Sequence, residues 1–158
     1  MDNEVVATLA LQDETLSLAR VETAEGSWTL KHLGLLAPVV TLRSAGAATN
    51  LAVFRPHALR HGKLQFQDGV TLDWVWIQES RPGGAFLSAD GVPLVRLHPH
   101  VGRDLNAAPG LEWCEVELGT GDPIRGRFAL LAAFGWYILL YDQLKEQDAA
   151  AAEMSLRI

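Results

Sequence analysis

The sequence FALLAAFGWYILLYD, residues 128–142, is the most apolar stretch of the chain and decides how the rest must fold. No charged residue occurs from Phe128 to Tyr141, so a helix over this stretch is apolar on every side. Such a helix has to be buried all round, in protein or in lipid. Fourteen helical residues rise about 21 Å, whereas the hydrocarbon core of a bilayer is about 30 Å thick. The length favours a helix buried in its own protein, and a tail-anchored membrane helix is the alternative.

The segment before this stretch contains a helix start signal. Asp122 is expected to be the N-cap and Pro123 the first helical residue, because both residue types favour those positions. We expect the helix to run from about 123 to 147. The last residues, DAAAAEMSLRI, are strong helix formers and are expected to form a surface extension or a frayed end. Close approach of neighbouring strands is favoured by the small residues Ala129, Ala132, Ala133 and Gly135.

A repeat of turn glycines divides the chain before the helix. Gly26, Gly46, Gly69 and Gly91 follow one another at intervals of 20, 23 and 22 residues, each between two alternating apolar runs. Asp precedes Gly at 68–69 and at 90–91, which is the strongest short hairpin signal because tight turns need a positive φ. The turns at Gly26 and Gly46 are expected to be loops of three to five residues.

The runs between these turns have the period-2 pattern of half-buried strands. Leu64 and Phe66 alternate with polar residues, and Cys114, Val116 and Leu118 share one face in a looser fifth copy of the repeat. Two further strands are expected in EVVATLAL and TLSLARV, near the start of the chain. About ten to twelve short strands with regularly spaced turns are typical of an antiparallel sandwich or barrel.

The predicted helix and the predicted strands can cover each other's apolar surfaces. A barrel of ten or twelve strands has an interior wider than its own side chains can fill. A fully apolar helix needs cover on all sides. We therefore predict a single domain over residues 1–158, all-β with one helix: a closed or nearly closed antiparallel barrel around a buried C-terminal hydrophobic helix. An open sandwich built from the same hairpins is the alternative.

This arrangement resembles the tubby C-terminal-like superfamily, which includes the LURP-one-related proteins and the phospholipid scramblases. The resemblance rests on LQFQDGVTLDW, AFLSADGVPLVRL and FALLAAFGWYILLYD, and it covers the chain from Glu4 to about Tyr141. It implies a barrel of about twelve strands around a C-terminal helix. It also implies binding at membranes, since tubby-like proteins bind phosphoinositide headgroups through basic side chains. This chain departs from the membrane-binding members in its acidic net charge, and it has no acidic calcium-binding loop of the D-x-D-x-D-G type.

Composition excludes several classes of protein. The net charge of −6 argues against a general nucleic-acid binder, which needs a positive surface. The single cysteine, Cys114, allows no disulfide within the chain and is expected to be a core thiol, because it lies on the apolar face of its strand. The first twenty residues lack the features of a secretory signal peptide, which favours a cytoplasmic location.

Positive charge is concentrated in one part of the chain. Residues 26–67 contain no acid, and the densest basic piece is FRPHALRHGK, residues 54–63. Charge-assisted hydrogen bonds from this piece could hold a phosphate or an anionic headgroup. The candidate anion-binding residues are Arg55, His57, Arg60, His61 and Lys63. Alternatively, these residues are solvated and pair with the acidic N-terminal strands.

Two pairs of histidines raise the question of a metal site. His57 and His61 would share a face of a helical turn, and His98 and His100 would share a face of an extended segment. A zinc or iron site would need both pairs to converge, with Asp104 nearby, because such sites take three or four ligands. Nothing in the sequence indicates that they converge, so we expect loop histidines on the surface and no metal site.

No catalytic motif accompanies these residues. The sequence lacks G-x-S-x-G, a P-loop, G-x-G-x-x-G and H-E-x-x-H. We therefore expect a non-enzymatic binding or scaffolding module without a cofactor, whose partner is an anionic lipid or a phosphorylated ligand. A metal-dependent enzyme that uses the paired histidines and a tail-anchored membrane protein are the alternatives. We expect the protein in the cytoplasm, peripheral to the membrane.

Overall fold

The computed structural model describes residues 7–12, 17–34, 36–57, 60–78, 82–99, 114–119 and 127–156, with side chains as far as residue 142. Ten strands and one helix make up this part of the chain. The elements are β1 (Ala7–Leu11), β2 (Leu18–Thr23), β3 (Gly26–Leu33), β4 (Val39–Ser44), β5 (Ala52–Pro56), β6 (Gly62–Phe66), β7 (Thr71–Ile77), β8 (Gly83–Leu87), β9 (Pro93–Pro99), β10 (Cys114–Leu118) and α1 (Phe128–Leu156).

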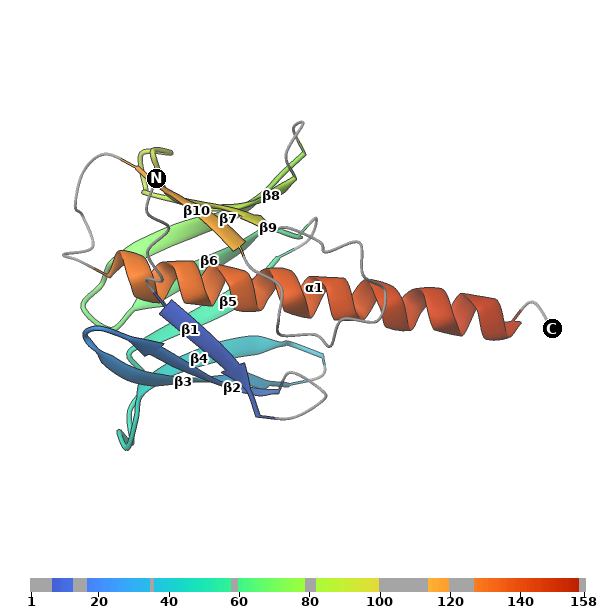
Figure 1. Cartoon of the computed structure of the whole chain (residues 1–158), viewed down its shortest axis with the longest axis horizontal. Helices are drawn as coiled ribbons and strands as arrows, with labels where there is room; N and C mark the ends of the chain where they lie inside the picture. The colour runs from blue at the N-terminus through green and yellow to red at the C-terminus, as the bar shows by residue number, and fades with distance from the viewer. Residues whose placement is uncertain are drawn as a thin grey trace.

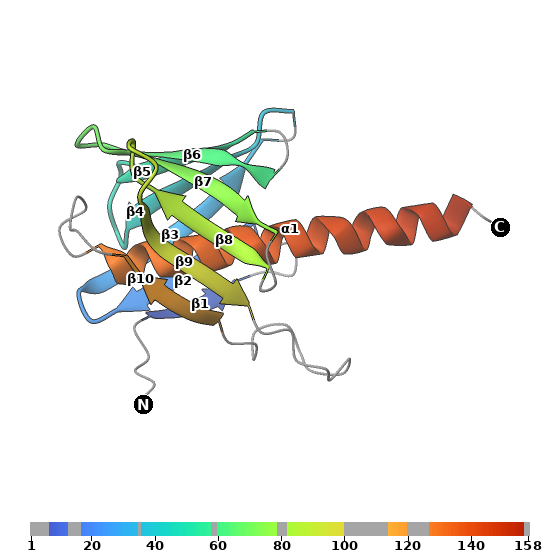
Figure 2. The same ribbon diagram turned by 90° about the horizontal axis from the view of Figure 1, so that it is seen from above.

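The strands form one antiparallel meander in which each strand pairs with the next, from β1 to β10. This confirms the predicted antiparallel sheet of about ten short strands with one C-terminal helix. The sheet curls round α1, with β10 on one side of the helix and β1 on the other (Figure 1). Seen from above, β5–β7 lie across the helix from β1 and β10 (Figure 2). Within the described residues no backbone pairing joins β10 to β1, so hydrogen bonds do not close the sheet.

The first half of α1 lies in the concave face of this sheet. Its side chains are at most 6% exposed at Leu130, Leu131, Ala132, Ala133, Phe134, Tyr137, Ile138 and Leu139. Phe134 makes edge-on contacts with Phe54 and Phe86, at centroid distances of 5.9 Å and 6.3 Å. Trp136 is partly buried and also packs against the core. The strands therefore supply the cover that this apolar helix needs. In the described part of the chain, no helix is both long and apolar enough to cross a membrane.

The end of α1 differs from the prediction. The helix continues to Leu156 rather than ending near 147, and its second half projects beyond the sheet (Figures 1 and 2). Residues 143–156 contain four alanines in a row and neither glycine nor proline, so nothing in the local sequence ends the helix. The expected N-cap and first residue, Asp122 and Pro123, lie outside the described residues.

The two Asp-Gly turns are tight, as predicted. Each is a three-residue loop closed by backbone hydrogen bonds, from Phe66 N to Val70 O (2.8 Å) in the first and from Ser88 N to Val92 O (2.9 Å) in the second. Gly69 has a φ of +96° and Gly91 of +78°. The turn before Gly26 is shorter than expected: Thr23 pairs directly with Gly26, so two residues rather than three to five connect the strands.

One of these turns fastens the start of the helix. Arg127 Nη2 lies 2.9 Å from Asp68 Oδ2, and its guanidinium stacks 4.6 Å above the ring of Phe66. Asp68 also accepts a hydrogen bond from the backbone N–H of Val70 at 3.2 Å. The β6–β7 turn thus contacts the arginine that precedes α1 and links the start of the helix to the sheet.

The indole of Trp74 is held between two glycines. A Cβ added to Gly84, on the adjacent strand β8, would overlap the Trp74 ring, and one added to Gly135, on α1, would lie 3.0 Å from Trp74 Cζ3. Trp74 is 1% exposed and packs against Phe86 at a centroid distance of 4.8 Å. The absence of side chains at both glycines leaves room for this large ring between sheet and helix.

Gly84→Ala should therefore destabilise the protein. The added methyl group has to displace a buried ring, and overpacking of this kind costs about 1–3 kcal/mol. Urea unfolding followed by circular dichroism measures the change. At a glycine with room for a methyl group, the change to alanine would instead stabilise the protein by about 0.4–1 kcal/mol, because alanine restricts the unfolded chain. A stabilised Gly84→Ala variant would contradict the packing described here.

Candidate functional site

A cavity of about 270 Å³ separates α1 from the strands on one side of the helix. The strands β3, β4, β5 and β7, the β5–β6 loop and α1 all contribute to its walls. The lining residues are His32, Val40, Phe54, Pro56, His57, Arg60, His61, Trp74, Tyr137, Ile138, Tyr141 and Asp142.

The cavity exists because α1 does not lie on the axis of the curled sheet. The helix approaches β8, β9 and β10 on one flank of the opening and β1 and β2 on the other. Gly135 allows this approach, since a Cβ there would lie 2.5 Å from Leu97 Cδ1 and 3.3 Å from Phe86 Cε2. Larger side chains, Tyr137, Ile138 and Tyr141, point to the cavity side. The helix is thus displaced from the middle strands, and space remains between them.

The walls combine apolar surface with polar groups. His32, Val40 and Phe54 are direct cross-strand neighbours on β3, β4 and β5, so they form one inward-facing row. His32 stacks on Tyr141 of α1, with 4.4 Å between ring centroids and 27° between ring planes. This stack joins β3, near the start of the sheet, to the end of the buried part of α1.

The β5–β6 loop forms the edge of the cavity. The N–H of His57 donates to the carbonyl of His61 at 2.7 Å, which closes the loop. Arg60 has a φ of +62°, a left-handed conformation uncommon for a residue other than glycine, and its guanidinium lies 4.7 Å from the centre of the Trp76 ring. His57, Arg60 and His61 are exposed. They therefore present one fixed positive charge and two imidazoles where the cavity meets solvent.

The five predicted anion-binding residues are divided between two faces of the sheet. His57, Arg60 and His61 line the cavity. Arg55 and Lys63 are direct cross-strand partners, and both are exposed next to the buried Phe54 and Leu64. These two cations therefore lie on the outer face, where Lys63 Nζ is 3.7 Å from Asp73 Oδ1. The structure brings three of the five residues together and places the other two elsewhere.

Sequence reasoning did not find the groups that complete the cavity. His32 is two residues from the buried Leu30, so strand alternation already placed it on the inner face. Tyr137 and Tyr141 are four residues apart, which places them on one face of α1. Both signals were present in the sequence. What the sequence did not show is that these two faces meet.

The ring of Trp74 is part of the cavity wall. Its indole Nε1–H is fully buried, and among the described residues no acceptor lies within hydrogen-bonding distance of it. A buried donor without an acceptor costs free energy, because the N–H loses its hydrogen bond to water. Trp74 therefore contributes aromatic surface to the wall.

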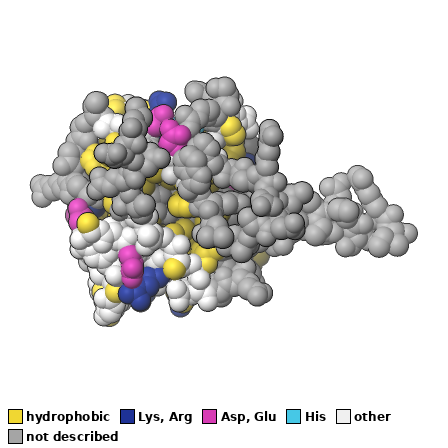
Figure 3. Space-filling view, viewed as in Figure 1, with side chains coloured by type: hydrophobic (Ala, Val, Ile, Leu, Met, Phe, Trp, Pro, Cys, Tyr) yellow, Lys and Arg dark blue, Asp and Glu magenta, His cyan; other side chains and the backbone are white. Residues whose placement is uncertain are grey.

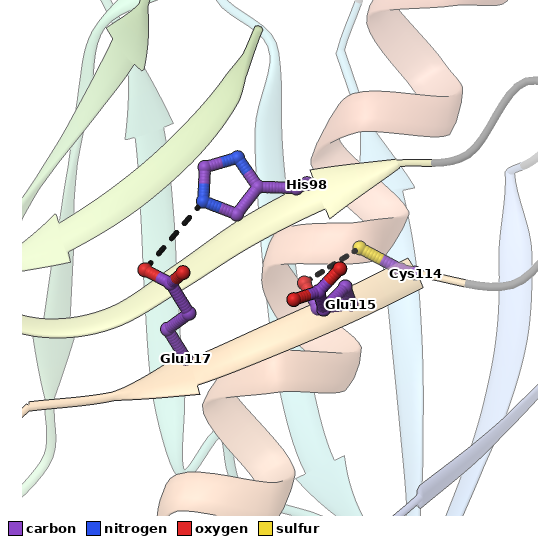
Figure 4. A network of polar contacts seen from close by, with 4 residues as sticks. All are labelled: His98, Cys114, Glu115 and Glu117. Atoms are coloured by element: carbon purple, nitrogen blue, oxygen red, sulfur yellow. Dashed lines mark hydrogen bonds and ion pairs between the residues drawn. The ribbon is translucent and has the colours of Figure 1, made fainter. Parts of the chain in front are cut away.

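The alternative of a metal site on the paired histidines finds no support in the part of the chain that the structure describes. No group of three or more His, Cys, Asp or Glu side chains is arranged there to hold an ion. His98 lies away from the cavity, on β9, with Nε2 3.7 Å from Glu117 Oε2 of β10 (Figure 4). His100 and Asp104 lie outside the described residues.

Cys114 lies at the start of β10, next to Glu115 (Figure 4). It is partly buried and packs against the hydrophobic core, in line with the prediction of a core thiol. Its Sγ–H donates to the carbonyl of Glu115 at 3.7 Å. Burial raises the pKa of the Cys114 thiol from its ordinary 9.0 to about 12; the Glu115 charge adds to this, and a backbone hydrogen bond with His98 opposes it. The thiol is therefore a poor nucleophile near neutral pH.

Comparison with protein-family models, curated proteins and solved structures finds no match for this chain.

Cys114 should be almost inert to iodoacetamide at pH 8 in the folded protein and react readily after unfolding in urea, because only the unfolded thiol ionises at that pH. The same pKa difference predicts a loss of stability above pH 9. There the unfolded chain releases the thiol proton while the folded chain keeps it up to about pH 12, so rising pH favours unfolding. Mass spectrometry of the alkylated protein measures the first effect, and comparing wild type with Cys114→Ser in urea titrations at pH 8 and 10 isolates the second. Equal alkylation rates in the folded and unfolded protein would contradict the raised pKa.

Proposed function

We propose that the protein is a non-enzymatic binding module that takes an anionic ligand, such as a lipid headgroup or another phosphorylated molecule, at the mouth of the cavity. The observation that supports this most is the convergence of His57, Arg60 and His61 on one edge of a cavity with apolar walls. A guanidinium forms directional, charge-assisted hydrogen bonds with phosphate and carboxylate groups.

The conformation of Arg60 supports the same proposal. A left-handed backbone at a residue with a long side chain costs of the order of 1–3 kcal/mol and persists where the surrounding structure enforces it. Here the hydrogen bond between His57 and His61 and the stacking on Trp76 hold the arginine in place. Among the described residues that line the cavity, Asp142 is the only carboxylate. It offsets part of the positive charge at the cavity.

The outer surface offers less support for an anion site. On the face seen in Figure 3, the charged side chains that are described are scattered and do not form one basic patch. On β2, Arg20 Nη2 lies 3.0 Å from Glu22 Oε1. On the outer face, Lys63 pairs with Asp73. Ion pairs of this kind neutralise the cations that a headgroup would need. The cavity mouth is therefore the better candidate.

We infer a nearly closed barrel of the tubby-like type, in which α1 rather than backbone pairing fills the gap between β1 and β10. Support comes from the helix, which lies close to β1 and β2 on one side of the gap and to β9 and β10 on the other. The ten-strand meander around a C-terminal helix supports the kinship. The proposed location is the cytoplasm, at the periphery of the membrane.

Amide hydrogen exchange tests the role of α1 in the gap. If the helix holds both edges, the paired amides of β1 and β10 should open with the same free energy as those of β4 and β5, because one cooperative unit contains them all. Opening of β1 and β10 at a distinctly lower free energy, with β4 and β5 unaffected, would reveal two independent edges and contradict the nearly closed barrel.

Arg60→Asn should weaken anion binding about tenfold or more, because a hydrogen bond to a charged group contributes about 1.5–3 kcal/mol. Asparagine suits the left-handed backbone at this position, so the loop is retained. Binding is measured by flotation with vesicles containing phosphatidic acid and by NMR titration with inorganic pyrophosphate. The two probes separate a membrane-bound headgroup from a soluble anion.

Arg55→Gln is the matched control, because it removes the same charge from the same hairpin but on the outer face. It should leave binding nearly unchanged. Equal losses in the two variants would indicate diffuse electrostatic attraction and contradict a site at the cavity mouth. Absence of wild-type binding to both probes would rule out the proposed function.

A further inference from the structure

The cavity behind the basic edge is larger than an anionic group needs, and much of its wall is apolar. Val40 and Ile138 face it from opposite sides, from β4 and from α1, and Phe54 and Trp74 complete this part of the wall. Val40, Phe54, Trp74 and Ile138 are each at most 5% exposed. A phosphate or a carboxylate at the basic edge would leave most of the cavity of about 270 Å³ unfilled. The shape therefore favours a ligand with an apolar body attached to its charged group.

We infer that the ligand is a small aromatic anion: a ring system that occupies the cavity and carries one phosphate or carboxylate, which reaches the basic edge. The inference rests on the proposed function for the charged end and adds the identity of the other end. Rings favour this cavity because its walls are themselves aromatic, including Phe54, Trp74, Tyr137 and the stacked pair His32–Tyr141. Aromatic pairs gain free energy beyond simple area burial.

The volume limits the size of the ring system. A cavity of about 150 Å³ with aliphatic and aromatic walls holds one benzene ring. The present cavity, at about 270 Å³, is large enough for one or two fused rings. It is too small for the two long acyl chains of a membrane phospholipid. The inference therefore assigns the cavity to a soluble aromatic anion rather than to a lipid tail.

The Trp74 ring provides a way to follow the ligand. Trp74 lines the cavity and is 1% exposed. An aromatic ring bound in the cavity would lie next to this indole, so the Trp74 N–H signal reports whether the cavity is occupied.

A series of ligands that share a phosphate group and differ in the size of the attached ring system tests the inference on the wild-type protein. The probes are inorganic phosphate, phenyl phosphate and 1-naphthyl phosphate, titrated into ¹⁵N-labelled protein. Affinity should rise at least about tenfold from inorganic phosphate to 1-naphthyl phosphate, because the rings bury apolar surface. The indole N–H signal of Trp74, assigned with Trp74→Phe, should shift with the aryl phosphates. Equal affinity across the series, or a Trp74 signal that stays in place, would overturn the inference.

Further experiments distinguish a failure of this inference from a failure of the proposed function. Ile138→Phe fills part of the cavity and should weaken 1-naphthyl phosphate about tenfold while leaving pyrophosphate binding intact. If that variant does not fold, the ligand series on the wild type still decides the question.

Pyrophosphate binding that depends on Arg60, without any gain from the rings, overturns the aromatic ligand and leaves the anion site. Binding of uncharged 1-naphthol as tight as that of 1-naphthyl phosphate, with pyrophosphate inert, overturns the anion site and with it this inference. Binding of vesicles with phosphatidic acid that 1-naphthyl phosphate does not displace assigns the site to a lipid and also overturns it.

Discussion

The burial of one uncharged helix is the constraint on which the rest of this structure depends. From Phe128 to Tyr141 the sequence offers no polar side that could face water, so a partner must surround it. Each large apolar side chain that leaves water contributes about 1.5–3 kcal/mol. Phe134 and Tyr137 are at most 1% exposed. No single sheet face can supply that much cover unless it bends round the helix, and a meander of short antiparallel strands can bend in this way.

The same requirement explains the cavity. A helix inside a curled sheet can be packed closely on all sides only if its side chains match the distance to every strand. In α1 the small residue Gly135 meets β8 and β9, where the sheet approaches closely. On the opposite side the gap to the middle strands is wider than Tyr137, Ile138 and Tyr141 fill. Close packing is thus concentrated on one flank of the helix, and the other flank keeps a space that a ligand can use.

The polar groups around that space come from distant parts of the chain. His32 belongs to the third strand, Arg60 to the loop after the fifth, and Tyr141 to the helix. Their positions depend on the same packing that buries the helix, because His32 stacks directly on Tyr141. A ligand in the cavity would therefore contact the sheet and the helix together. Binding and the stability of the helix within the sheet are expected to be coupled for this reason.

Local chemistry by itself determined the elements of this protein. Alternation of apolar residues defined the strands, Asp68-Gly69 and Asp90-Gly91 defined two turns, and the missing charges of residues 128–141 defined the helix. These features depend on backbone geometry and on neighbours a few residues apart. The lack of backbone pairing between β1 and β10 and the separation of Arg55 from Arg60 followed from tertiary structure. So did the meeting of His32 with Tyr141. The physical reason is that periodicity reports which side of an element is buried, whereas the distance between two buried sides depends on how the whole sheet bends and where the helix lies within it.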